Sequence, residues 1–218
     1  MVRHILSDHI HALLCEDRDP HSACLGVGFT APYLSAFKTC AGQIVTLVPK
    51  ALGIAPAATV GEPAVPNEES TLPFGEACFD RVILIHALEA AESARTLLRQ
   101  VWRVLTPEGR LFLVVPNRVS LWAMMDVSPF ACGRPYRKSE LSMLLRDTLF
   151  EPLSWRRALY MPPRSGRNPV FASTLWESVG PRFFPSLGGV HIAAAKKSLY
   201  GVTPLPEAQK SHAQLVHA

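Results

Sequence analysis

The chain of 218 residues lacks any long hydrophobic run. Its longest apolar stretch near the middle, Leu111 to Val115, is far too short to cross a bilayer, which needs about 20 apolar residues. The first residues also lack the basic, apolar and small-residue regions that make up a secretory signal peptide. These absences predict a cytoplasmic protein that has no membrane partner.

Paired cysteines are missing as well. The five cysteines are odd in number and widely spaced, and no two of them form a Cys-x-x-Cys pair. This pattern favours neither a disulfide framework nor a zinc site. We therefore expect reduced, mostly buried thiols and no metal centre.

A strong charge of either sign is also absent, since the net charge is only +4. Phosphate backbones are usually bound by a concentrated basic stripe, so we expect no nucleic-acid partner. The small surplus is nevertheless uneven, because nine Lys and Arg stand against four Asp and Glu between Arg118 and Arg167. This segment is either a solvated basic face or a region that meets an anionic substrate.

What the chain does have is a regular alternation of helical and strand patterns, with 48% hydrophobic residues. Such an order predicts an α/β fold, in which helices cover both faces of a mainly parallel sheet. One domain over residues 1–201 is expected, with inserts at about 116–138 and 160–188, and residues 202–218 are expected to form a disordered tail. Helices are expected at 3–15, 30–40, 92–105 and 139–149, and strands at 23–25, 43–48, 64–65, 81–86, 110–115, 152–159 and 189–195.

The first motif is a glycine turn, Cys24-Leu25-Gly26-Val27-Gly28-Phe29-Thr30-Ala31, between a strand and a helix. Glycines allow a nucleotide to approach the backbone, and the helix that follows is expected to offer free amides. A side chain at Gly28 should then project into the ligand's space. The spacing also satisfies the dinucleotide fingerprint, so a nicotinamide enzyme is one interpretation and a turn without any ligand is another.

A longer motif covers residues 68–82, Glu-Glu-Ser-Thr-Leu-Pro-Phe-Gly-Glu-Ala-Cys-Phe-Asp-Arg-Val, and is followed by a buried strand and His86-Ala87-Leu88-Glu89. The next helix ends in Arg-Val-Leu-Thr-Pro-Glu-Gly at residues 103–109, and Pro116-Asn117 follows the fifth strand. With these motifs the chain resembles the class I S-adenosylmethionine-dependent methyltransferases from about residue 23 to 117. The resemblance implies a Rossmann-like sheet of seven strands, whose last strand is antiparallel and inserted between the fifth and sixth.

The resemblance also implies methyl transfer from S-adenosylmethionine to a small-molecule acceptor. The sulfonium already activates the methyl group, so the protein must align the reactants and sometimes remove a proton. His86 is the candidate base, although a histidine that closes a strand often only packs. The implied cofactor contacts are Gly26, Val27, Gly28, Phe29, Glu68, Glu69, His86, Ala87 and Leu88.

The segment after the fifth strand commonly shapes the acceptor pocket in this fold. Each of its polar and aromatic residues is therefore either a substrate contact or an ordinary loop residue. The candidates for substrate contacts are Asn117, Arg118, Trp122, Arg134 and Tyr136.

Several residues depart from the family pattern. Cys24 stands where relatives carry an acid, Thr30 replaces the third motif glycine, and no acid closes the second strand at Val48-Pro49. Losing a charged acceptor for the ribose should cost about 1.5–3 kcal/mol of cofactor binding. A catalytically silent, methyltransferase-like binding or regulatory protein is therefore the alternative function. For a nicotinamide enzyme, Lys50 could meet a 2′-phosphate, but no acid follows the glycines at the required distance.

Overall fold

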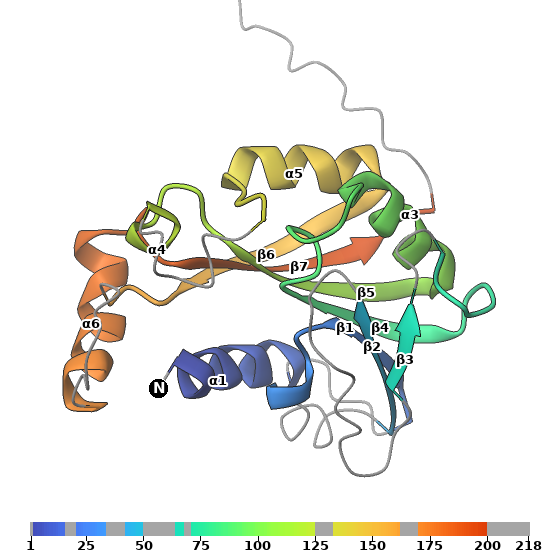
Figure 1. Ribbon diagram of the computed structural model, residues 1–218, viewed down its shortest axis with the longest axis horizontal. Coiled ribbons are helices and arrows are strands. Elements are labelled where there is room, and N and C mark those ends of the chain that lie inside the picture. Colours follow the sequence, from blue (N-terminus) through green and yellow to red (C-terminus); the bar gives the residue numbers. More distant parts are fainter. Residues whose placement is uncertain are drawn as a thin grey trace, which may run out of the picture.

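A mixed sheet of seven strands forms the centre of the protein in the computed structural model, which describes residues 2–15, 21–33, 42–49, 64–67, 71–124, 133–161 and 170–199 (Figure 1). The strand order is β3-β2-β1-β4-β5-β7-β6. Neighbours from β3 to β5 pair in parallel, whereas β7 pairs antiparallel with both β5 and β6. The strands are β1 (Ala23–Gly28), β2 (Gln43–Pro49), β3 (Ala64–Asn67), β4 (Phe79–Ile85), β5 (Leu105–Pro116), β6 (Phe150–Ala158) and β7 (Val190–Lys197).

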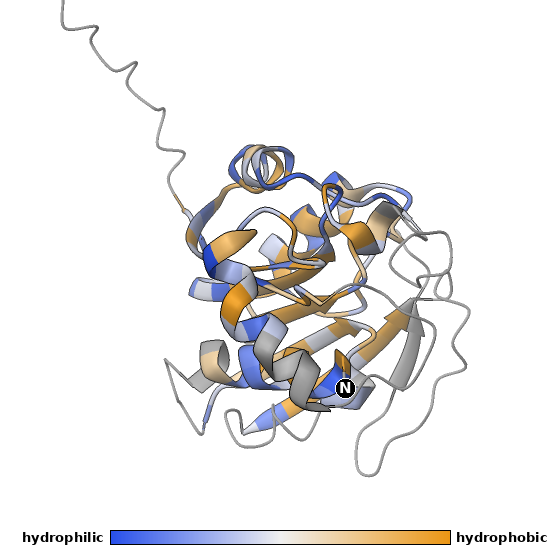
Figure 2. Ribbon diagram, turned by 90° about the vertical axis from the view of Figure 1, so that its left-hand side faces the viewer, coloured by the Kyte–Doolittle hydropathy of each residue, from blue (hydrophilic) through white to orange (hydrophobic). Residues whose placement is uncertain are grey.

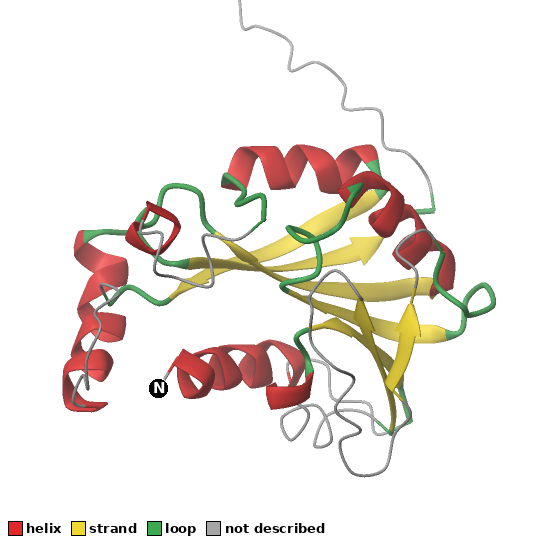
Figure 3. Cartoon of the chain, viewed as in Figure 1, coloured by secondary structure: helices red, strands yellow, loops and turns green. Residues whose placement is uncertain are grey.

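Helices cover both faces of this sheet, as Figure 3 shows. On one face α1 (Val2–Cys15) packs Leu6 and Ile10 against a buried cluster that includes Ile83 and Ile85. On the other face α3 (Ala94–Val104) and α5 (Lys138–Asp147) cover a second buried cluster. Successive residues of a strand point to opposite faces, so the apolar runs of β4 and β5 supply both clusters. Much of the sheet in the interior is accordingly orange in Figure 2.

The start of α3 illustrates how local sequence sets an element. The Ser93 hydroxyl accepts a hydrogen bond from the Thr96 amide at 3.2 Å, which satisfies one of the free donors of the first turn. The helix then buries Leu97, Leu98 and Val101 along one side. Periodicity in the sequence predicted this helix, and the cap fixes where it begins.

The expected α/β class with a mainly parallel sheet is confirmed. The strand expected near residues 64–65 is β3, which lies at an edge of the sheet, where prolines are tolerated. The segment expected to be antiparallel is β7, inserted between β5 and β6. Within the described residues, no helix is both long enough and apolar enough to span a membrane.

One expectation about helices needs correction and another is tested only in part. No helix was predicted in the insert at 160–188, but it contains α6 (Val170–Phe183), which accommodates Pro181 near its end. The helix expected at 30–40 is described only as a short 3-10 helix, η1 (Ala31–Tyr33), and its remainder lies outside the described residues. A short α4 (Leu121–Met124) follows β5, and the expected tail at 202–218 also lies outside the described residues.

Candidate functional site

The glycine turn lies at the carboxyl end of β1, next to the end of β4. Gly28 has a φ of +94°, and the Phe29 amide donates a hydrogen bond to the Ile85 carbonyl oxygen at 2.7 Å. A Cβ on Gly28 would lie 2.2 Å from that same oxygen. The expectation that a Gly28 side chain would project into ligand space is therefore wrong, because the backbone of β4 already occupies that space.

The Thr30 side chain covers the other glycine of the turn. A Cβ on Gly26 would lie 3.1 Å from the Thr30 methyl group. Thr30 is fully buried, and its hydroxyl has no hydrogen-bond partner. Buried hydroxyls are normally bonded, so this orphaned oxygen is a polar atom that a ligand at the turn could satisfy.

The backbone amides of the turn are less available than the sequence suggested. The Phe29 amide donates to Ile85, and the Thr30 amide donates to the Gly28 carbonyl oxygen at 2.9 Å. Cys24, at the position of the family's acid, is buried in the apolar cluster on the α1 face. The turn thus offers a ligand the unpartnered Thr30 hydroxyl, without the usual acid.

His86 follows β4 directly and points its ring at Glu89. Its φ of +54° is unusual for a residue other than glycine, although histidine tolerates this region better than most. Nδ1 lies 2.7 Å from the Glu89 Oε1 atom, and the side chains are 16% and 4% exposed. A carboxylate at Nδ1 orients the ring and selects the tautomer whose lone pair is on Nε2. The other oxygen of Glu89, Oε2, is buried without a partner.

Glu89 was missed by the sequence analysis as a site residue. The available signal was its position three residues after His86 in a turn that closes a buried strand, which alone is weak. Across the described residues, no three His, Cys, Asp or Glu side chains gather in a way that could hold a metal ion. The His86–Glu89 pair, a histidine held by a carboxylate, has the groups that acid–base chemistry uses.

The segment at residues 133–136 lies directly on this turn. The Arg134 amide donates to the Glu89 carbonyl oxygen at 3.1 Å, and the Tyr136 hydroxyl makes a long 3.5 Å contact with the Leu88 carbonyl oxygen. Burial, followed by the nearby Glu89 carboxylate, raises the pKa of Tyr136. Two predicted acceptor residues, Arg134 and Tyr136, are thus brought beside the predicted base.

The other three predicted acceptor residues hold the structure together. Asn117 is buried and donates from Nδ2 to the carbonyl oxygens of Ser186 and Gly188 at 2.9 and 2.8 Å. Trp122 is buried and donates from Nε1 to the Met161 carbonyl oxygen at 2.7 Å.

Arg118 forms a 3.0 Å ion pair with Glu140 on the surface. The observed contacts of Asn117, Trp122 and Arg118 thus anchor the chain around them, and none of these contacts is made with His86 or Glu89.

The remaining predicted cofactor residues differ in their surroundings. Val27, Ala87 and Leu88 are buried in the cluster on the α3 and α5 face, whereas Phe29 is 39% exposed. The three buried residues expose almost no surface to a ligand, and their part in cofactor binding stays a prediction. The predicted adenine acceptors, Glu68 and Glu69, lie outside the described residues.

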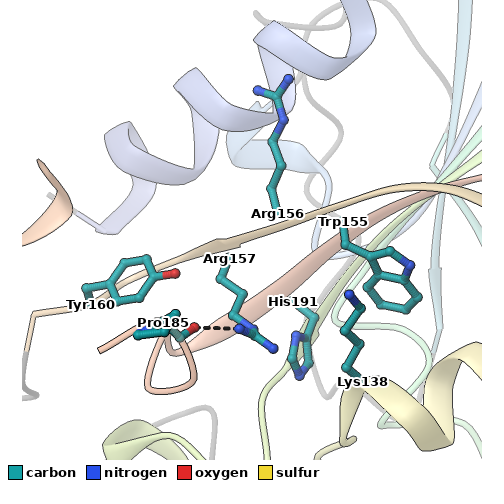
Figure 4. A pocket seen from close by; sticks show the side chains of 7 residues that line it. All are labelled: Lys138, Trp155, Arg156, Arg157, Tyr160, Pro185 and His191. Carbon is teal, nitrogen blue, oxygen red and sulfur yellow. Dashed lines mark hydrogen bonds between the residues drawn. The ribbon is translucent and has the colours of Figure 1, made fainter. Parts of the chain in front are cut away.

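A second group of polar residues, also missed as a site, lines a pocket of about 170 Å³ beside β6 and β7. Figure 4 shows the Lys138, Trp155, Arg157 and His191 side chains near one another, while Arg156 points to the opposite side of β6. The basic surplus between residues 118 and 167 was the signal that could have found this pocket. Its lining residues are Lys138, Trp155, Arg156, Arg157, Tyr160, Pro185 and His191.

Comparisons with known proteins agree with this architecture. Residues 22–113 match a family model described as a methyltransferase domain. A comparison with curated protein sequences gave no match.

Solved structures with the same fold include a putative methyltransferase from Haloferax volcanii, in complex with the Trm112 methyltransferase activator. That structure is 16% identical with a TM-score of 0.65, and the match covers 89% of this chain and 91% of that one. A putative methyltransferase from Bacillus halodurans is 16% identical with a TM-score of 0.60, covering 86% and 98% of the two chains. The [4+2]-cyclase SpnF is 18% identical with a TM-score of 0.60, covering 88% and 82%.

Proposed function

We propose that the chain is a class I methyltransferase with S-adenosylmethionine as its cofactor, and that it transfers the cofactor's methyl group to a small-molecule acceptor beside His86. The match of residues 22–113 to a methyltransferase domain and the shared fold of solved methyltransferases support this proposal. The observation that carries this proposal is the contact between the glycine turn and the end of β4. The Phe29 amide bonds the Ile85 carbonyl oxygen, and His86 is the next residue after Ile85. The strand order reverses between β1 and β4. In open α/β sheets, ligands bind beyond the carboxyl ends of the strands at such a reversal.

The chain's own residues have separate tasks in this proposal. Gly26, Gly28 and the Thr30 hydroxyl would hold the methionine part of the cofactor, which would supply an electrophilic methyl group. His86 Nε2 takes up the proton that the nucleophilic atom of the methyl acceptor gives up. Glu89 is a positioning residue, because its Oε1 fixes the ring through Nδ1. Its buried Oε2 can accept a hydrogen bond from the acceptor or the cofactor.

The strength of cofactor binding is expected to be low. β2 ends at Val48 and Pro49, so no carboxylate is available there for the ribose hydroxyls. We expect S-adenosylhomocysteine to bind in the micromolar to millimolar range, about −8 to −4 kcal/mol.

Calorimetry with S-adenosylmethionine and S-adenosylhomocysteine on the purified chain tests the proposal. Saturable binding of one molecule per chain supports it. Binding of NADP in place of both compounds would assign the turn to a nicotinamide cofactor and overturn the proposal.

A second candidate function is a methyltransferase-like protein without methyl transfer. The observation that favours it is the combination of a buried Cys24 and a Thr30 side chain packed over Gly26. The fold permits such a change of role, since the proteins that share it include a [4+2]-cyclase. Absence of binding of every nucleotide cofactor to a folded chain would favour this candidate over the enzyme.

A further inference from the structure

The pocket beside β6 and β7 lies at the same end of the sheet as His86. We propose that this pocket binds the anionic group of the methyl acceptor, and that the acceptor is a small aromatic carboxylate. The inference rests on the proposed function for the role of acceptor, whereas the pocket's preference for such an anion stands on its own contacts.

Positive charge converges on the pocket from two elements. Lys138 begins α5 and places its Nζ 5.3 Å from the centre of the Trp155 ring. Arg157, on β6, donates from Nη1 to the Pro185 carbonyl oxygen at 2.5 Å, which holds the guanidinium in place. The nearby acids are engaged elsewhere, because Glu177 accepts the Leu159 and Tyr160 amides and Glu140 pairs with Arg118.

His191 supplies the observation that points to a ligand. Its ring lines the pocket, only 2% of the residue is exposed, and neither ring nitrogen makes a well-formed hydrogen bond, although the Tyr136 backbone lies close to the ring. Burial, followed by the charges of Arg157 and Lys138, lowers the pKa of His191 to about 4, and the nearby Tyr136 backbone opposes this shift. A buried ring without well-formed hydrogen bonds is costly, and a carboxylate would accept one from its N–H group.

An incoming anion would also change the electrostatics in a defined way. It would offset the charges of Lys138 and Arg157, which disfavour a proton on His191. The imidazole could then be protonated and donate a charge-assisted hydrogen bond to the carboxylate. Binding of the anion and uptake of a proton by His191 are therefore coupled.

The pocket's walls and size favour a small flat ligand. The Trp155 ring stands edge-on to the His191 ring, with centroids 6.3 Å apart, and Tyr160 adds a second aromatic wall. A volume of about 170 Å³ is below the roughly 300–1,000 Å³ of pockets for drug-sized ligands. Aromatic walls combined with two cations suit a ring that carries a carboxylate.

The strand register places this pocket within reach of the transfer site. His191 pairs with Val115 on β5, and the His86 amide donates to the neighbouring Val114 carbonyl oxygen. Two strand spacings separate β4 from β7, which corresponds to about 10 Å. Tyr136 lies between the sites, because its hydroxyl reaches Leu88 while its backbone lies near His191. An acceptor held at His191 can therefore present a nucleophile near His86.

The direct test is nuclear magnetic resonance of the histidine side-chain nitrogens of the full chain, titrated with benzoate at constant ionic strength. Saturable shifts of the His191 signals, with a rise in its pKa, are expected. Benzamide, which has the same ring without the charge, should leave these signals unchanged. An equal response to benzamide, or no response to benzoate, would overturn the proposal, and an equal response to inorganic phosphate would overturn its aromatic part.

Variants of the two pocket cations and of an arginine outside the pocket test these contacts. Arg157→Met should weaken benzoate binding by about tenfold, since it removes a charged partner. Arg95→Met removes the same charge from a surface ion pair with Asp147, outside the pocket lining, and should have little effect. Lys138→Met, which leaves the Arg157 contact with Pro185 intact, should weaken binding as well. Equal affinities across all three variants would overturn the proposal.

Failure of this inference can be told apart from failure of the proposed function. S-adenosylhomocysteine binding that persists without any benzoate response at His191 overturns only the pocket. Benzoate binding without S-adenosylhomocysteine binding supports an anion site but overturns its assignment to a methyl acceptor.

Discussion

The part of the chain that matches the methyltransferase model and the part beyond it use polar groups differently. Within residues 22–113, the glycine turn is closed by its own hydrogen bonds to Ile85 and Gly28. Beyond residue 113, His191 is buried with its ring nitrogens unpartnered, beside Lys138 and Arg157. The first part also keeps two unpartnered oxygens, Thr30 Oγ1 and Glu89 Oε2, but among the described residues it is the second part that sets such a group beside two positive charges.

This difference shows that a glycine motif can serve chain packing as well as a cofactor. Gly28 is required because β4 passes too close to admit any Cβ. Specificity for an acceptor is better sought beyond the family match, where Lys138 and Arg157 gather beside the His191 ring. The predictions below test the two parts in order of expected effect.

The largest effect is expected at Gly28. Gly28→Val combines a positive φ with a Cβ placed 2.2 Å from the Ile85 carbonyl oxygen, so it should lower the free energy of unfolding by about 4 kcal/mol. Urea denaturation of variant and parent measures the loss. Gly26→Ala is the control and should cost much less, because only the Thr30 side chain must shift. A Gly28→Val protein as stable as the parent would show that the turn is not closed on β4.

The next-largest effect, a loss of stability at acidic pH, is expected from protonation of His191 in the second part of the chain. Its pKa is about 4 when folded and 6.5 when unfolded, so the unfolded state binds the extra proton first as pH falls. Stability should therefore decrease from about pH 6.5 down to pH 4, by about 3 kcal/mol in total. Thermal or urea unfolding across this range measures it.

His191→Phe is the control for this pH dependence. A phenyl ring fills similar space but cannot be protonated, so the corresponding part of the pH dependence should disappear. An identical pH profile in parent and variant would assign the dependence to other groups.

The third effect concerns His86, which lies in the first part beside residues 133–136 of the second. His86→Asn should reduce methyl transfer by about 10²-fold, since it removes the base. Asparagine tolerates the positive φ of His86, so the fold should be retained. Release of S-adenosylhomocysteine, measured with an acceptor found among small aromatic carboxylates, provides the rate. The affinity for S-adenosylhomocysteine should change little.

Glu89→Gln provides the matching test of positioning. It should lower the rate less than His86→Asn, because the base remains and only the carboxylate that orients its ring through Nδ1 is replaced. A rate unchanged in both variants would remove His86 and Glu89 from the reaction.

The smallest effect is expected from restoring an acid at the end of β2. Val48→Asp or Pro49→Asp should tighten S-adenosylhomocysteine binding by about tenfold, or 1.4 kcal/mol, because the ribose hydroxyls regain a charged acceptor. Both variants are needed because either of these two neighbouring positions can face the ribose. Nanomolar binding by the parent would show that another group already holds the ribose.

Sequence patterns predicted the fold well because each element is determined locally. The apolar run of β4 and the periodic Leu97, Leu98 and Val101 of α3 need no distant partner to be recognised. The insert at 160–188 was harder, because Pro181 suggested a break where the chain forms α6. Among the site residues, His86 was found because it closes a buried strand.

The sequence by itself therefore determined the order of helices and strands, the turn between β1 and η1, and the basic surplus after β5. Only the tertiary structure decided that Glu89 Oε1 meets His86, that β4 fills the space beside Gly28, and that Arg157 lies beside His191. Hydrophobic periodicity can be recognised in a single sequence because it depends only on neighbours along the chain. Contacts between residues 157 and 191 depend on the pairing register of β6 and β7, which sequence spacing does not specify.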